Sequence, residues 1–308
     1  MNDLNELQLI LDHRERQWQE HCKFVLNRVL LPLCNGGNSK PESPYKRALV
    51  LIENRINQQW LFTVLNSWLM CPADTELILI TDQQNLDQAK NQLKQAAPGI
   101  KANFKCIEDL SPETNLSDYG SFNRMMKTSS FWKRLPHEQL LVIQTDALLA
   151  KPLDPFFFQF CYLGAPFLPR QHTEYFEKRR VDGRIKRFFK IDTPIHGSPH
   201  PDTYPHLHGN GGLSIRHRSM MIEACNNWGH SSPETEAEDV FFSRHISKIK
   251  PLPPLEIAQA FATETTYNSM AVGSHACWKF LSSSDLADHF CQHLRHASSM
   301  ANALRQQS

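Results

Sequence analysis

Long hydrophobic runs are missing from this chain of 308 residues, and so is any excess of charge of one sign. No apolar run approaches the ~20 residues that a membrane-spanning helix needs. The first residues also lack the basic and apolar regions of a signal peptide. The formal net charge of +1 provides no field that would attract nucleic acid in bulk. We therefore expect a cytoplasmic protein with no transmembrane segment and no nucleic-acid partner, and leave peripheral contact with the inner face of the membrane open.

The sequence motifs of several common sites are missing as well. The eight cysteines are scattered and form no CxxC pair, so neither a zinc knuckle nor a disulfide framework is indicated. GxGxxG and GxxxxGK[ST] do not occur, which disfavours dinucleotide binding of the Rossmann type and P-loop chemistry. The absence of GxSxG leaves an α/β-hydrolase serine without support.

Apolar runs and helical patterns alternate in the first half of the chain. Strands of the buried type are predicted at residues 47–53, 76–82 and 140–143, with a weaker strand at 102–107. Helices are predicted at 60–70, 86–97 and 122–135. Strands that alternate with helices predict an α/β fold with a mostly parallel sheet and right-handed crossovers.

Both ends of the chain carry helical patterns. Apolar residues recur at helical spacing from Leu4 to Val29, which predicts a first helix that ends near Pro32. We favour a helix packed on the main domain over a dimer-forming or membrane-surface helix. The predicted organisation is an N-terminal helix and linker at 1–44, a main domain at 45–285, and a C-terminal helix and tail at 286–308.

The most informative stretch is 140–149, where four apolar residues lead into Gln144-Thr145-Asp146 and a second apolar run follows. This pattern predicts a buried strand that delivers Asp146 to the edge of a sheet. A carboxylate there suits a hard cation that carries a diphosphate, as in a nucleotide joined to a sugar. A turn or a helix cap is the alternative. His275, in a late loop, could close the same metal site or be structural.

An acidic pair, Glu238 and Asp239, begins a predicted helix whose apolar residues extend to Ile246. The helix dipole stabilises carboxylates in a first turn, and this alone can explain the pair. The functional interpretation is that one carboxylate is a general base for an acceptor hydroxyl. The turn at 209–212 allows close approach of the backbone to a ligand, or forms a hairpin.

A Pro-rich loop contains four histidines, which could bind a transition metal: His196, His200, His206 and His208. Their spacing is irregular and no regular element holds them. We therefore favour the interpretation that these histidines belong to a mobile loop that covers the active site.

Seven segments between residues 45 and 280 together resemble a domain-of-unknown-function family classed with glycosyltransferases of the GT-A type. They are 51–55, 122–132, 142–146, 164–167, 209–216, 238–241 and 273–278, and they include the QTD, NGG and EDV motifs. The resemblance implies a Rossmann-like GT-A sheet flanked by helices. It also implies a nucleotide-diphospho-sugar donor, with a UDP-sugar as the first expectation, and a glycan, lipid-linked or protein acceptor.

The resemblance also implies a metal site and a catalytic base. Asp146 matches the last Asp of a DxD motif and His275 matches a late His, which would hold Mn²⁺ or Mg²⁺. Gln144 stands where the first Asp would be, and this departure puts the metal requirement in question. Asp239 would be the base of an inverting enzyme, with Glu238 as the second candidate.

The donor-binding residues implied by the resemblance come from several segments: Glu53, Arg55, Asn123, Gln144, Thr145, Asp146, Gly211 and Gly212. Glu53 and Arg55 would lie near the nucleotide base, whereas Gly211 and Gly212 would line the pocket for the acceptor and the donor sugar.

The leading hypothesis is a hexosyltransferase-like enzyme, and the resemblance favours a role in polysaccharide biosynthesis. Two alternatives stay open. Gln144 favours a non-catalytic protein that binds a nucleotide-sugar or a glycan on a degenerate transferase fold. The histidine loop favours a metal-dependent phosphoesterase.

Overall fold

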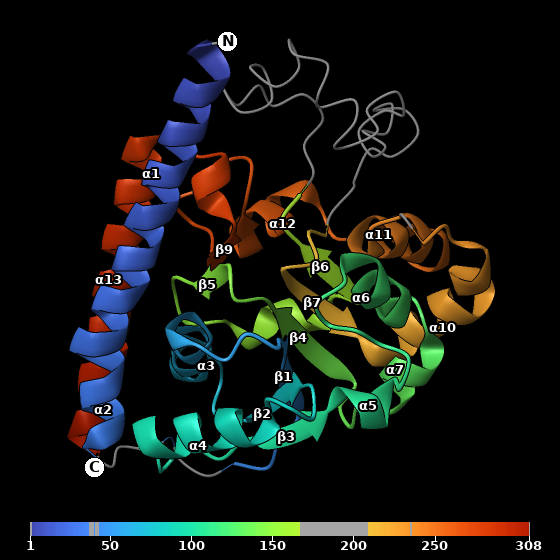
Figure 1. Cartoon of the computed structure of the whole chain (residues 1–308), viewed down its shortest axis with the longest axis horizontal. Helices are drawn as coiled ribbons and strands as arrows, with labels where there is room; N and C mark the ends of the chain where they lie inside the picture. Colours follow the sequence, from blue (N-terminus) through green and yellow to red (C-terminus); the bar gives the residue numbers. More distant parts are fainter. Residues whose placement is uncertain (1, 37–39, 41–42, 167–208, 235, 308) are drawn as a thin grey trace.

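The computed structural model describes residues 2–36, 40, 43–166, 209–234 and 236–307 (Figure 1). The four histidines of the Pro-rich loop lie outside these described residues, and so does Phe167, the last residue of one of the segments that carry the family resemblance. Within the described part of the chain, no helix is long and apolar enough to cross a membrane.

A six-stranded sheet with the order β3-β2-β1-β4-β7-β6 forms the centre of the molecule. Its strands are β1 (Arg47–Ile52), β2 (Thr75–Thr81), β3 (Asn103–Cys106), β4 (Gln139–Ile143), β6 (Tyr162–Gly164) and β7 (Leu213–His217). β1 to β4 run parallel, whereas β7 is antiparallel to both β4 and β6. The predicted α/β fold with a mostly parallel sheet is therefore confirmed.

Side-chain alternation along the strands explains why both faces of this sheet are covered. In β1, Leu49 and Leu51 belong to one apolar core, whereas Ala48 and Val50 belong to the core on the opposite face. Every residue of β1 is buried, as expected for a parallel strand between two layers of helices.

The helices of one layer are α3 (Gln58–Met70), α4 (Leu86–Ala96), α1 (Asn2–Val25) and α13 (Ser283–Gln307). The other layer contains α5 (Ile107–Leu110), α6 (Tyr119–Met126), α7 (Ser129–Lys133), α10 (Arg218–Trp228) and α11 (Glu238–Ile249). A second sheet, β5-β9-β8, contains β5 (Ala147–Leu149), β9 (Gly273–His275) and β8 (Ala262–Thr263). Short elements complete the described fold: α12 (Leu255–Phe261), η2 (Pro155–Gln159), η3 (Gly229–Ser231) and η4 (Cys277–Lys279).

The N-terminal helix continues past the predicted end at Pro32. After α1, a π-helical segment η1 (Leu26–Leu30) leads into α2 (Leu31–Asn35), and Pro32 lies in the first turn of α2. The backbone is helical through Leu30 and Leu31, so the helix is continuous, and the π-helical turn directly before Pro32 accommodates a residue that has no N–H to donate. α1 packs on α3 and lies along α13, as the favoured interpretation of this helix predicted (Figure 1).

The helix predicted at 122–135 is in fact two helices, α6 and α7. Thr128 between them has an extended conformation (φ −110°, ψ 122°). Lys127 turns away here, and its ammonium group donates to Ser232 Oγ and to the carbonyls of Pro233 and Glu236. These contacts to a distant segment explain a break that the local pattern does not reveal.

Candidate active site

The carboxyl ends of β1 and β4 define the place where a ligand is expected. From β1 the chain continues to β2 and β3 on one side, and then crosses to β4 on the other side of β1. Loops that leave the two strands diverge at such a switch point, and open α/β sheets bind ligands there. Glu53 directly follows β1, and Gln144, Thr145 and Asp146 directly follow β4.

A cleft of about 1270 Å³ lies over these two strand ends. Five residues that the sequence assigned to donor binding line it: Glu53, Arg55, Gln144, Thr145 and Asp146. Tyr119 and Phe122 of α6 contribute to the same cleft. The structure therefore brings the predicted residues of β1 and β4 together.

Glu53 connects the ends of the two strands. Its Oε2 accepts hydrogen bonds from Thr145 Oγ1 (2.9 Å) and Arg55 Nη2 (2.7 Å), and its Oε1 accepts from Arg55 Nε (2.9 Å). Burial alone would raise the pKa of Glu53, but the hydrogen bonds and charge of Arg55 outweigh it and lower the pKa. Glu53 is thus an ionised group that positions Thr145 and Arg55, and the Arg55 side chain is 74% exposed.

Asp146 and His275 meet because β5 and β9 pair with Ala147 opposite His275. Asp146 Oδ1 lies 3.2 Å from His275 Nε2, and Glu264 Oε1 lies 3.4 Å from His275 Nδ1. Burial would lower the pKa of His275, but the charges of Asp146 and Glu264 raise it to about 10. Burial would likewise raise the pKa of Asp146, but His275 lowers it to about 2. At neutral pH this structure holds an ion pair.

Asp146 and His275 could hold a divalent cation only together with further oxygen atoms from a bound ligand or water. The Asp146 carboxylate is 35% exposed, and His275 Nε2 is a buried nitrogen with no hydrogen bond within the described residues. Within the described part of the chain, no three or more His, Cys, Asp or Glu side chains are arranged so that they could hold a metal ion by themselves. Two protein ligands suit Mg²⁺ or Mn²⁺, which retain water and take phosphate oxygens. The ion would replace the proton on His275.

Gly211 and Gly212 are required for packing beneath the site. A Cβ at Gly212 would lie 2.1 Å from His275 Cδ2, and a Cβ at Gly211 would lie 2.1 Å from Glu238 Oε1. Asn210, which the sequence reasoning passed over, donates to Glu264 Oε1 (2.8 Å) and accepts from the amide of Gly212 (2.8 Å). The turn therefore fixes the partners of His275, a role that the NGG pattern alone does not reveal.

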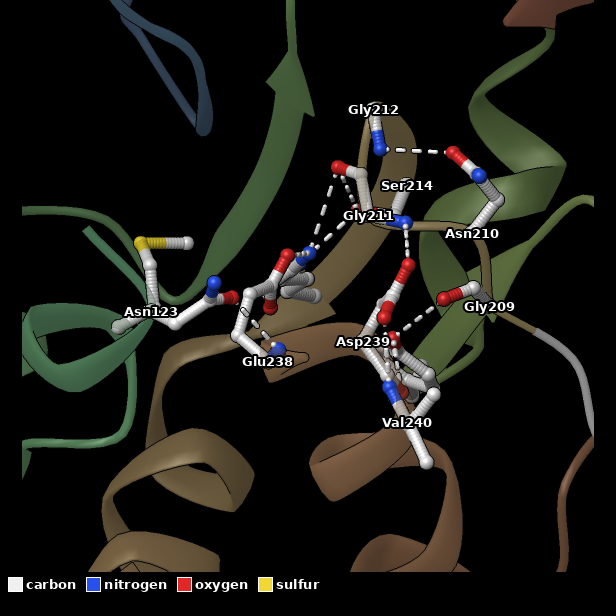
Figure 2. A network of polar contacts seen from close by, with 12 residues as sticks. Asn123, Gly209, Asn210, Gly211, Gly212, Ser214, Glu238, Asp239 and Val240 are labelled. Carbon is white, nitrogen blue, oxygen red and sulfur yellow. Dashed lines mark hydrogen bonds and ion pairs between the residues drawn. The ribbon is translucent and has the colours of Figure 1, made fainter. Parts of the chain in front are cut away.

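Asp239 lies in the first turn of α11 with its carboxylate directed at the glycine turn (Figure 2). Its Oδ2 accepts from the amide of Gly211 (3.1 Å) and its Oδ1 from the amide of Val240 (2.7 Å). Burial first, and the charge of Glu238 second, raise the pKa of Asp239 to about 7 despite these bonds. After burial, the charge of Asp239 is the next cause that raises the pKa of Tyr119. Tyr119 lines the cleft, whereas Asp239 is not among its lining residues.

Glu238 is fully engaged by a buried arginine. Its Oε2 lies 2.6 Å from Arg216 Nη1 and its Oε1 2.9 Å from Arg216 Nη2, and both side chains are almost completely buried. The guanidinium also lies over the rings of Trp132, Tyr162 and Phe242, at 5.4–5.7 Å. Both oxygens are paired with the guanidinium and the side chain is buried, which makes Glu238 a poorer candidate for the base than Asp239.

Asn123 also lies away from the cleft. It is buried, its Oδ1 accepts from the amide of Glu238 (2.9 Å), and its Nδ2 donates to the carbonyl of Tyr119 (2.8 Å). Asn123 therefore holds the start of α11 in place. Asn123 is not among the residues that line the cleft, and its contact with a donor stays a prediction.

Comparison with known proteins gives one family and several distant folds. The model of the family described as "Protein of unknown function (DUF5672)" matches residues 106–276, more than half of the chain. No curated protein matches the chain.

Among solved structures, the chain is similar to mouse xyloside xylosyltransferase 1 (12% identity, 68% of this chain and 83% of that chain, TM-score 0.42). It is similar to the glycosyltransferase GlyE of Streptococcus pneumoniae (10%, 85% and 64%, TM-score 0.43). It is also similar to the mannosyltransferase PcManGT of Pyrobaculum calidifontis, which was solved with GDP-Man and Mn²⁺ (11%, 79% and 64%, TM-score 0.38).

Proposed function

The chain belongs to the DUF5672 family, and we propose that it moves a sugar from a nucleotide-diphospho-sugar donor to an acceptor hydroxyl. One observation carries this proposal: two carboxylates at the same edge of the sheet have opposite environments. Asp146 has a pKa of about 2 beside His275, whereas Asp239 has a pKa of about 7. Environments that separate two carboxylates in this way mark one as a permanent charge and the other as a proton acceptor.

The permanently charged carboxylate, Asp146, would act on the diphosphate of the donor. Asp146 and His275 would hold Mn²⁺ or Mg²⁺ together with phosphate oxygens, and such an ion offsets the charge that grows on a leaving diphosphate. Arg55, which Glu53 fixes in place, lies in the same cleft and supplies a cation for phosphate oxygens. Gln144 supplies an amide there in place of a carboxylate.

The proton acceptor is Asp239. In its ionised form it removes the proton of the acceptor hydroxyl as that oxygen attacks the sugar carbon, while the bond to the diphosphate breaks and the nucleoside diphosphate leaves. A positioned carboxylate base contributes roughly 10²- to 10⁴-fold to the rate. The amides of Gly211 and Val240 orient the carboxylate, and Glu238 and Asn123 position the helix that bears it. Attack from the side opposite the leaving group inverts the sugar carbon.

The first test is a thermal-shift panel of nucleoside diphosphates and their sugars, each with and without Mn²⁺. A ligand at about 100 times its Kd stabilises a protein by roughly 2.7 kcal/mol, well within detection. A shift with one nucleoside diphosphate family, uridine first, that depends on Mn²⁺ supports the proposal. Transfer to added acceptors, followed with Asp239→Asn as the control, then tests the chemistry.

One observation favours a second candidate. Asp146 and His275 satisfy each other's charge without a metal, and Gln144 lacks the carboxylate of a DxD motif. A protein that binds a nucleotide-sugar or glycan without turnover needs nothing more. Donor binding that is unaffected by Mn²⁺, together with no transfer and no donor hydrolysis, would favour this candidate.

A further inference from the structure

Helix α1 lines the cleft although it lies outside the residues that the family model matches. Five of its residues contribute to the cleft surface: Glu15, Trp18, Gln19, Glu20 and Lys23. Positions 15, 19 and 23 are four residues apart, so they lie along one face of the helix. The proposed function above assigns no role to this face.

α1 is held firmly enough to present a preformed surface. Trp18 packs on Trp278 of η4 with ring centroids 4.3 Å apart. One turn further along, the His21 ring stacks on Phe290 of α13 at 4.3 Å, and His21 Nε2 lies 2.8 Å from His293 Nδ1. Cys22 is completely buried. A ligand therefore meets this face without first having to order it.

The polar groups on this face have capacity for a ligand. Gln19 Nε2 lies 3.5 Å from Glu15 Oε1, at the upper limit of a hydrogen bond, and Lys23 Nζ lies 3.7 Å from Glu20 with both side chains mostly exposed. Trp18 is 3% exposed, and its indole Nε1 has no hydrogen-bond partner within the described residues. An amide, an ammonium group, carboxylates and an indole N–H are groups that pair with the edge of a base and with ribose hydroxyls.

The order of strands indicates which part of the donor reaches α1. Along the sheet edge, Glu53 follows β1, Asp146 follows β4, and Asp239 lies against the turn that precedes β7. β1, β4 and β7 are neighbours in that order. A donor is linear, with its diphosphate between nucleoside and sugar. If the diphosphate lies at Asp146 and the sugar faces Asp239, the nucleoside must extend to the β1 side.

α3 follows β1, and α1 packs on α3 and on η4. η4 begins two residues after His275. Ala276, between them, has a left-handed backbone (φ 43°), and its amide donates a hydrogen bond to the carbonyl of Asp146 (2.9 Å). This hydrogen bond holds the left-handed conformation in place. The contact between Trp18 and Trp278 is therefore tied directly to the proposed diphosphate site.

We propose that α1 is the nucleoside-binding wall of the donor cleft and that Gln19 and Lys23 are specificity-determining residues for the nucleoside. This inference rests on the proposed function, because that function places the diphosphate at Asp146. It assigns the selection of the base and ribose to a helix outside the matched part of the chain.

Isothermal titration of the full chain with UDP, GDP, CDP and ADP, and with inorganic pyrophosphate, tests this assignment in the presence of Mn²⁺. The variants are Gln19→Ala and Lys23→Ala, with Gln17→Ala and Arg16→Ala as matched controls that are exposed on the same helix but do not line the cleft. All four side chains are exposed, so the variants should keep the wild-type melting temperature.

We expect Gln19→Ala and Lys23→Ala to weaken the preferred nucleoside diphosphate by roughly tenfold, the effect of losing one or two hydrogen bonds. Pyrophosphate affinity should not change, and neither control should alter any affinity. In turnover assays the KM for donor should rise while kcat stays constant, since the lost contact is remote from the reacting atoms.

Equal affinity of wild type and both variants for the nucleoside diphosphate would overturn the assignment, and so would a parallel loss of pyrophosphate affinity. Both outcomes leave the proposed function standing, provided that the wild type binds a nucleoside diphosphate. A wild type that binds none of the four overturns the proposed function itself, and this inference with it.

Discussion

Replacing Asp239 by asparagine should remove turnover. It should also change the free energy of unfolding relative to the wild type, in a direction that favours the variant more at pH 8 than at pH 5. Both effects have one cause, which is that the fold raises the pKa of this carboxyl group from 3.8 to about 7, by burial first and by the charge of Glu238 second. A base with this pKa is half ionised near neutral pH. kcat/KM should therefore fall roughly tenfold for each pH unit below about 6.5 and level off above about 8.

The stability effect has a definite sign. Because the pKa of Asp239 is higher in the folded than in the unfolded state, the protonated form stabilises the fold below pH 3.8, and this contribution is lost as the pH rises through about 7. Of the range from pH 5 to pH 8, only the two units below the folded-state pKa of about 7 contribute. The free energy of unfolding therefore falls by at most about 2.7 kcal/mol over this range. Because Asp239 is only partly buried, we expect about 1–2 kcal/mol.

Asparagine has one oxygen, so it can accept only one of the two bonds from Gly211 and Val240. This loss is the same at both pH values, and it cancels when the free energy of unfolding of variant and wild type is compared between pH 5 and pH 8. Asp87→Asn is a matched control, because Asp87 is an exposed carboxylate in the first turn of α4. A flat pH profile of kcat/KM, or an Asp239→Asn variant with near-normal turnover, would refute the assignment of the base.

Three further predictions follow from other contacts. Arg216→Met should cost about 3–5 kcal/mol in denaturant unfolding, because it leaves Glu238 as an unpaired buried charge; an effect below 1 kcal/mol would contradict the pairing. Asp146→Ala should weaken both Mn²⁺ and nucleoside diphosphate in titration calorimetry, and unchanged affinity for both would contradict its role. Burial lowers the pKa of His21 to about 4 and also holds the pKa of His293 well below its usual range, so both bind protons mainly when the protein unfolds. Stability should thus fall as the pH drops from 6.5 towards 4, and His21→Gln should reduce this slope in melts across that range.

The sequence predicted the structure well where a run of apolar residues marks a buried strand and the polar residues after it mark the end of that strand. The apolar runs of β1 and β4 end in polar triplets, and a run of that kind has to lie inside a sheet and terminate at its edge. The position of Asp146 follows from this local rule. The meeting of Asp146 with His275 does not, because it depends on the pairing of β5 with β9 across more than a hundred residues.

The positions where helices break or continue were harder to predict, because they also depend on features that the local sequence does not show. Thr128 separates α6 from α7 while Lys127 bonds to a segment about a hundred residues further along the chain. The π-helical segment η1 lets the first helix pass Pro32. In both places the deciding contact or backbone geometry is not visible in the local spacing of apolar residues.

Glu238 and Asp239 are the clearest case of a distinction that only the fold makes. Adjacent residues on a helix point about 100° apart, so one carboxylate enters the cage around Arg216 while its neighbour meets the amide of Gly211. The two carboxylates are linked, because the charge of Glu238, which pairs with Arg216, contributes to the raised pKa of Asp239. The charge of Glu238 therefore helps to make its half-buried neighbour a base near neutral pH. A sequence shows two equivalent acidic residues here, and the fold gives them different chemistry through one arginine.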